Sequence, residues 1–284
     1  MLRSLFSAIS GLRANQTMLD VTGNNIANAN TVGFKSSNIV FQDTLSQMLT
    51  AGAAPAGANG GTNPIQIGLG VQVGGVTTNF NQGSAQVTGR LTNLMISGDG
   101  FFAVSRGGEN IFTRAGAFNF DSAGTLVTTD GDVVQGYAAD PTTGAITPTG
   151  APVDIRIPAM VDETAANPMR SYNIGNDGVI TGIYADGTKK PLFQVALANF
   201  ANPEGLEKVG DTAFRTGTNS GTVQYGAPGT GRRGDLMGGS LEMSNVDLAQ
   251  EFTNLIIAQR GFQATSRVIT TSDQVLEELV NIKR

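Results

Sequence analysis

The groups best suited to chemistry in this chain are a glycine-rich loop and a few closely spaced aspartates. Gly229, Gly231 and Gly234 match the G-x-G-x-x-G pattern that holds dinucleotide phosphates. That pattern requires a strand directly before it and a helix directly after it. Here Pro228 precedes the loop and a Gly-Gly pair follows soon after. We therefore interpret the segment as a loop that leads out of a β domain.

Asp130-Gly131-Asp132 and Asn176-Asp177-Gly178 bring oxygen ligands close together, as a calcium site requires. Neither run continues into the spaced oxygen ligands and terminal Glu of an EF-hand loop, and turn chemistry explains both. The 23 acidic residues are scattered, and no pair stands out as the two facing carboxylates of a glycosidase. We expect no catalytic residue, no metal site and no cofactor.

Composition excludes further classes of function. The 284 residues include no Cys, His or Trp. This excludes Cys/His zinc sites, Ser-His-Asp and Cys-His catalysis, and a histidine pH switch. The net charge is -5, and the sequence shows no basic face for phosphate contacts, so we expect no nucleic-acid partner. These exclusions favour a protein that is not an enzyme.

Apolar spacing predicts a long helix at each end of the chain, the first from near Arg3 to near Asn28 and the second from about Ser244 to the C-terminus. Ser244 or Asn245 is expected to cap the second helix. The seam residues recur at intervals of three, four and seven, and they are Leu5, Ile9, Leu12, Leu19, Ile26, Leu248, Phe252, Leu255, Phe262, Ile269 and Leu276. A second stripe on the last helix consists of Val268, Val275, Leu279 and Ile282. Two stripes on one helix indicate more than one neighbour.

The region between the helices has β signals, namely short apolar runs separated by turns. Four Asp-Gly pairs, at 99–100, 130–131, 177–178 and 186–187, favour tight turns between strands. The expected aromatic core anchors are Phe112, Phe118, Phe120, Tyr137, Phe193 and Phe200. The amphipathic piece from Ile39 to Met48 fits either a helix or an extended segment. The Gly- and Ala-rich residues 50–64 fit a flexible linker or long loop.

These elements predict an α+β fold in which the long terminal helices form an antiparallel coiled coil and the centre is an all-β domain. The expected division is a helical domain of residues 1–49 plus 240–284, a linker or long loop over 50–69, and a β-rich domain over 70–239. Self-association would bury the helix stripes. The alternative is that each helix packs on its own β domain as ordinary core. No apolar run is long enough for a membrane span, and the N-terminus lacks the apolar core of a signal peptide.

The segment from Asp20 to Lys35 closely resembles the N-terminal signature of bacterial flagellar rod and hook proteins. The run from Leu94 to Phe102 resembles the β-domain signature of that family, and the run from Ser244 to Gln263 its C-terminal end. The signature residues are Asn24, Asn25, Ala27, Asn28, Gly33, Phe34, Lys35, Ser244, Asn245, Val246, Gln259 and Arg260. The resemblance covers nearly the whole chain.

Within the family, the segments from Gly261 to Arg267 and from Thr271 to Gln274 are more similar to hook than to distal rod sequences. Two features fit the rod instead: the chain lacks the outer domain of larger hook proteins, and distal rod proteins carry an extra segment near 50–64. The resemblance therefore favours a hook subunit, with the distal rod protein as the alternative. A secreted β-rich adhesin or binding module is the alternative outside the family.

The resemblance implies a structural subunit that self-assembles into a hollow, bendable helical tube and transmits torque from rod to filament. The implied partners are further copies of the chain, the flagellar rod, the hook cap, the hook–filament junction proteins and the type III export apparatus. The implied location is the flagellum, reached without a cleaved signal peptide. An export-gate pattern would fall on Leu5 to Ile9 or on Phe41 to Leu45.

Overall fold

The computed structural model describes residues 2–55, 60–140, 144–148, 150–157 and 168–282. They fall into two compact units. The first, here called the helical unit, contains the described parts of 1–27, 37–78 and 247–284. The second, the β unit, contains the described parts of 28–36 and 79–246. In both units, segments far apart in the sequence fold together, so the chain must be nearly complete before either unit can form.

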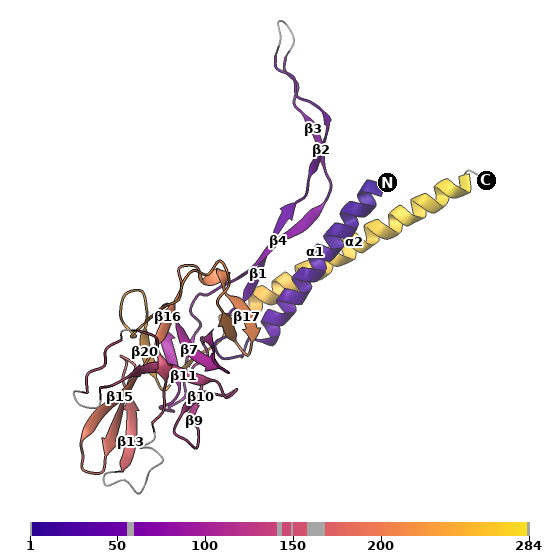
Figure 1. The fold of residues 1–284 in the computed structure, drawn as a ribbon. Coiled ribbons are helices and arrows are strands. Elements are labelled where there is room, and N and C mark those ends of the chain that lie inside the picture. Colours follow the sequence, from indigo (N-terminus) through magenta and orange to yellow (C-terminus); the bar gives the residue numbers. More distant parts are fainter. Residues whose placement is uncertain (1, 56–59, 141–143, 149, 158–167, 283–284) are drawn as a thin grey trace. The chain divides into compact units, whose positions relative to one another are not determined.

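The helical unit is built on two long helices, α1 (Leu2–Ala27) and α2 (Leu248–Ile282). They lie side by side in Figure 1. A Cβ atom at Gly11 would lie 3.2 Å from Thr265 Cγ2, and one at Gly261 would lie 2.7 Å from Asn15 Oδ1. Because each step forward along α1 is matched by an equal step backward along α2, the helices are antiparallel.

Asp247, and neither Ser244 nor Asn245, caps α2. Its Oδ1 accepts hydrogen bonds from the backbone N–H groups of Ala249, at 2.9 Å, and Gln250, at 3.3 Å. The helix therefore begins a few residues later than its sequence suggests. Ser244 and Asn245 make their side-chain hydrogen bonds inside the β unit instead.

The helical unit also carries a two-stranded ribbon (Figure 1). Strand β1 (Ser37–Asp43) pairs antiparallel with β4 (Val71–Thr78), and β2 (Ser46–Thr50) pairs with β3 (Ile65–Gly68). An isolated bridge between Ala53 and Thr62 continues the pairing. The structure thus differs from the expected division of the chain, because part of the expected linker at 50–69 is strand and β4 belongs with the helices.

The β unit holds the remaining strands. They are β5 (Ala85–Val87), β6 (Leu94–Ser97), β7 (Phe101–Arg106), β8 (Glu109–Thr113), β9 (Phe118–Phe120), β10 (Leu126–Thr128), β11 (Val133–Ala138), β12 (Val153–Asp154), β13 (Met169–Ile174), β14 (Val179–Tyr184), β15 (Lys189–Val195), β16 (Leu197–Asn199), β17 (Glu207–Gly210), β18 (Ala213–Arg215), β19 (Gln224–Gly226), β20 (Asp235–Gly238) and β21 (Ser240–Glu242). A short 3-10 helix, η2 (Pro203–Gly205), lies between β16 and β17.

The main sheet runs in the order β13-β14-β15-β11-β7-β8-β18-β17, and its neighbouring strands are antiparallel. Separately, β20 pairs with β6 and β21 with β5, which joins the end of the unit to its beginning. All four Asp-Gly glycines have positive φ, as the turn prediction requires. Three of these turns join paired strands, whereas Asp99-Gly100 joins β6 to β7, which are not paired.

Aliphatic and aromatic residues together fill the core of the β unit, where Phe102 and Phe118 stack edge to face at 5.0 Å between ring centroids. Of the expected anchors, Phe112, Phe118, Tyr137 and Phe200 are buried, whereas Phe120 and Phe193 are half-buried at its margin. No helix in the described part of the chain is long and apolar enough to cross a membrane.

Candidate assembly surfaces and the polar clusters behind them

The predicted helix seam is only partly covered in a single chain. Nine of its residues are half-buried, namely Leu5, Ile9, Leu12, Leu19, Ile26, Leu255, Phe262, Ile269 and Leu276. Leu248 and Phe252 are exposed, at 43% and 51% of their surface. Small or polar residues around Gly11 and Gly261 also lie at the contact between α1 and α2. A glycine in the middle of a long helix, Gly261, predicts such a close approach from the sequence, and the structure places Asn15 of α1 against it.

Helix α2 exposes a further apolar surface. The second stripe remains open to solvent, with Val268, Val275 and Leu279 each 44–49% exposed and Ile282 80% exposed. Ile256 and Ile257 are more than half exposed as well. Large apolar faces are rarely left uncovered in a monomer, so this stripe is a candidate contact surface.

The ribbon exposes apolar side chains on both of its strands. They include Leu45, Met48, Leu49, Ile65, Ile67 and Leu69, and Leu45 is 81% exposed. A two-stranded ribbon is marginally stable by itself in water. Packing of these side chains against a neighbouring molecule would stabilise it.

Behind the helix surfaces lies a buried asparagine. Asn25, only 1% exposed, uses its whole amide. Nδ2 donates to the Ser37 carbonyl at 2.9 Å and to Glu251 Oε1 at 3.0 Å, while Oδ1 accepts from the Ser37 N–H at 3.0 Å. One side chain therefore joins α1, β1 and α2 within the helical unit.

The β unit contains a buried group of three charges: Lys35, Arg114 and Glu242, each no more than 3% exposed. Lys35 Nζ donates to Glu242 Oε1 at 2.6 Å, and Arg114 Nη1 lies 3.3 Å from Glu242 Oε2. Burial lowers the pKa of both cations, and Glu242 opposes that shift. One carboxylate from β21 thus serves two cations from distant parts of the sequence.

Further hydrogen bonds around this group join the first and last segments of the β unit. Gly83 N–H also donates to Glu242, at 2.9 Å, and Gly33 N–H donates to its backbone carbonyl at 2.8 Å. Gly33 has φ of +70°, and a Cβ atom there would lie 2.5 Å from the backbone nitrogen of Ala115. Asn245 Oδ1 accepts from the Ser36 N–H, and its Nδ2 donates to the carbonyls of Asn79 and Asn81.

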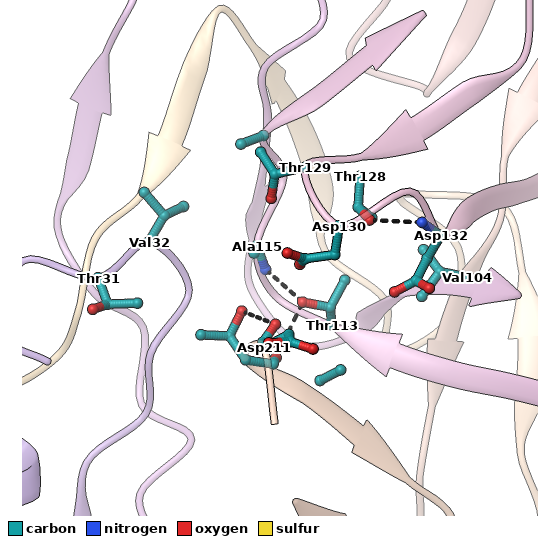
Figure 2. A pocket seen from close by; sticks show the side chains of 13 residues that line it. Thr31, Val32, Val104, Thr113, Ala115, Thr128, Thr129, Asp130, Asp132 and Asp211 are labelled. Atoms are coloured by element: carbon teal, nitrogen blue, oxygen red, sulfur yellow. Dashed lines mark hydrogen bonds between the residues drawn. The ribbon is translucent and has the colours of Figure 1, made fainter. Parts of the chain in front are cut away.

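The β unit contains a cavity of about 300 Å³, shown in Figure 2. Asp130, Asp132 and Asp211 line it together with threonines. Arg106 already binds two of these acids, at 2.7 Å from Asp132 and 3.2 Å from Asp211. No group of three or more His, Cys, Asp or Glu side chains that could hold a metal occurs among the residues that the structure describes. The cavity therefore offers no assembled cation site.

The glycine-rich segment follows the loop interpretation. Gly229, Gly231 and Gly234 lie between β19 and β20, so a strand and not a helix comes directly after them. Arg233 N–H donates to the Thr230 carbonyl at 3.2 Å in a turn of this loop. The structural context of a dinucleotide site is thus missing from this segment.

Comparison with known proteins identifies the family. Residues 5–35 match the family model "Flagella basal body rod protein", 95–182 match "Flagellar hook protein FlgE/F/G D1 domain", and 237–282 match "Flagellar basal body rod FlgEFG protein C-terminal". The chain is 45% identical over 285 residues to the flagellar basal-body rod protein FlgG of Bacillus subtilis, with all of both chains covered. The chain belongs to the flagellar hook and basal-body rod family.

Hook proteins of the family are also similar to it. The flagellar hook protein FlgE of Borreliella burgdorferi is 31% identical over 441 residues, and that of Treponema pallidum 29% over 463, with all of each chain covered. Members of this family are structural components of the bacterial flagellum, which is therefore the location of this chain. Family membership also removes the adhesin alternative.

The flagellar signature residues divide by role in the structure. Asn25, Gly33, Lys35 and Asn245 form the buried contacts described above. Ser244 Oγ accepts from the Val246 N–H at 3.3 Å, and Phe34 lies under the ammonium of Lys208, 5.4 Å from ring centroid to Nζ. Asn24, Ala27, Gln259 and Arg260 are exposed, and Asn28 is half-buried. The first group contributes to the folding of the two units.

Proposed function

We propose that this chain is a structural subunit of the flagellar basal-body rod, and that it assembles with copies of itself into a hollow helical tube. One observation carries the proposal. The alignment with a rod protein runs the full length of both chains at 45% identity over 285 residues, against 284 residues here. The alignments with hook proteins extend over 441 and 463 residues, so those proteins contain long segments that this chain lacks.

Self-assembly would proceed through the terminal helices. Their seam residues and the exposed second stripe of α2 would form a coiled-coil layer around a central channel, with the β units in an outer layer. The exposed apolar faces of α2 and of the ribbon support this arrangement because burial would stabilise them by about 25 cal/mol per Å². The other partners implied by the family are the neighbouring rod, hook, cap and junction proteins and the type III export apparatus.

Rod and hook differ in their mechanical task. A rod transmits torque as a stiff shaft, whereas a hook must bend. The ribbon of strands β1 to β4 supports the rod, because a paired segment that reaches a neighbour would add a contact between subunits. The chain would then be held to adjacent copies by both its helices and its ribbon.

A deletion strain separates the two candidates. We expect that cells without this protein lack the outer part of the rod and therefore also the hook and filament, and that the full-length gene restores all three. Electron microscopy of isolated basal bodies is the measurement. Basal bodies with a complete rod and no hook would reverse the assignment in favour of the hook subunit.

A further inference from the structure

Glu251 differs from every other acidic residue described in the helical unit. It is 7% exposed. The other described acidic side chains of the unit are exposed, and they are Asp20, Asp43, Asp247, Asp273, Glu277 and Glu278. A buried carboxylate is costly unless it is paired or well supplied with hydrogen bonds. Its position therefore calls for a partner.

A single chain gives Glu251 only part of that support. Oε1 accepts one hydrogen bond from the neutral amide of Asn25 at 3.0 Å, and the residue lies in the first turn of α2, where the helix dipole favours negative charge. No ion pair is found among the described residues of the helical unit. Among the residues that the structure describes, the carboxylate thus has no cationic partner.

A pocket of about 210 Å³ lies next to this carboxylate. It is lined by Met18, Val21, Thr22, Ser37, Asn38, Ile39, Glu251 and Asn254, all of the helical unit. Apolar side chains form part of its wall, and Glu251 is its one acidic group. This combination suits a long side chain with an apolar stem and a cationic end. A lone carboxylate provides too few oxygen ligands for a calcium ion.

The side chains that could fill the pocket with a cation belong to the helical unit of other copies of this chain. The described basic residues of the helical unit are Arg3, Arg13, Arg260 and Arg267, and all four are exposed on α1 or α2. We propose that the pocket at Glu251 receives an arginine side chain from the helix pair of a neighbouring copy. The inference rests on the proposed assembly into a tube, since that assembly brings a second copy against these helices. A guanidinium donates several N–H groups in one plane and binds a carboxylate by charge-assisted hydrogen bonds.

The decisive variant is Glu251→Gln, which preserves the shape of the side chain and an acceptor for Asn25 but removes the charge. We expect the full-length variant to fold as the wild type does, with an unchanged circular dichroism spectrum. The critical concentration for tube formation, measured by sedimentation and negative-stain microscopy, should rise about tenfold or more. Glu277→Gln, at an exposed position of the same helix, is the matched control and should leave that concentration within about twofold.

Arginine variants identify the partner. Each of Arg3, Arg13, Arg260 and Arg267 is changed to Gln, alone and together with Glu251→Gln. One arginine variant should raise the critical concentration as Glu251→Gln does, and adding Glu251→Gln to it should have little further effect. Unchanged assembly of Glu251→Gln, or additive effects with all four arginines, would overturn the inference while wild-type tubes still support the proposed function. A wild type that forms no tube would overturn the proposed function and this inference with it.

Discussion

Glu242 is the residue on which the buried charges of the β unit depend. We expect Glu242→Gln to lower the free energy of unfolding by about 3–5 kcal/mol, because it leaves Lys35 and Arg114 as buried cations without a counterion. Urea unfolding of the full-length protein at low concentration measures the change. Glu207→Gln is the control, since its ion pair with Arg215 is about half exposed and should contribute no more than about 1 kcal/mol.

Replacing all three charged residues tests whether the loss of stability in Glu242→Gln comes from the unpaired charges. Lys35→Met, Arg114→Met and Glu242→Leu together should recover most of the stability that Glu242→Gln removes, because apolar side chains of similar volume carry no desolvation cost. If the triple variant were as unstable as Glu242→Gln, hydrogen bonds to Asn81 and Gly83, rather than charge, would account for the loss.

Replacing either of two glycines in the N-terminal signature by alanine should change the free energy of unfolding, in opposite directions for the two positions. Gly33→Ala should destabilise the protein by about 1–3 kcal/mol, because φ is +70° and the added Cβ would meet the backbone of Ala115. Gly23→Ala lies within α1 with nothing inside 4 Å of the added Cβ, so it should stabilise the free chain by about 0.5–1 kcal/mol. Thermal unfolding of both variants measures the difference, and equal shifts would contradict the assigned backbone geometry.

Sequence patterns predict residues where the signal is local. The positive φ of Gly131, Gly178 and Gly187 follows from the Asp-Gly pairs, because the turn and its residues are adjacent. The charged group of Lys35, Arg114 and Glu242 has no such signal, since its members come from distant parts of the chain and only the folded sheet brings them together. The same holds for Asn25 and Glu251, each of which resembles a polar residue on a helix surface when taken alone.

At the level of elements, the register of α1 against α2 predicts which pairs of introduced cysteines can form a disulfide. The chain has no cysteine, so an introduced pair can be followed without interference. Gly11→Cys with Thr265→Cys should form an intramolecular disulfide under mild oxidation, because a Cβ at Gly11 would lie 3.2 Å from Thr265 Cγ2. Gly11→Cys with Ser272→Cys, displaced by about 10 Å along α2, should not. Peptide mapping by mass spectrometry of dilute protein distinguishes the two, and crosslinking in both or in neither would contradict the register.

For the ribbon, local composition predicts the wrong kind of structure. Residues 50–64 are rich in Gly and Ala, which favours a flexible linker, yet β2 and β3 flank much of this segment as paired strands. Strand pairing between residues 46–50 and 65–68 depends on partners that a window of sequence does not contain. The helices were easier to predict, because their period of 3.6 is visible within each segment.

Deletion of the ribbon's outer part tests its role. Removal of residues 46–68, with Thr44-Leu45 joined to Leu69 through Asn-Gly, should leave the free energy of unfolding within about 0.5 kcal/mol, because the apolar side chains removed are exposed in the single chain. Tubes formed by this variant should be less straight and should disassemble at lower denaturant concentration. Straight tubes of wild-type stability would show that the ribbon makes no contact between subunits.

For the whole molecule, assembly should depend on apolar surface that stays exposed to solvent in the monomer. Low charge, at 14% of residues, and an exposed stripe on α2 favour hydrophobic contacts between copies, beside the ion pair proposed at Glu251. The sequence already predicts this α+β arrangement with helices at both ends. It does not predict which seam residues remain exposed, because that depends on how closely the small residues near Gly11 and Gly261 let the helices approach.

Phe252→Asp is the variant that tests this dependence most directly. Phe252 is 51% exposed in the single chain, so a charge there should change the free energy of unfolding by less than about 1 kcal/mol while preventing its burial against a neighbour. Phe262→Asp should block assembly too, but Phe262 is half-buried and its loss would also weaken the helical unit. Gln250→Asp places the same charge at an exposed polar position of α2 and serves as the control. Sedimentation should show monomer for Phe252→Asp under conditions in which the wild type and Gln250→Asp form tubes. Normal tubes from Phe252→Asp would mean that this face of α2 stays in contact with water after assembly.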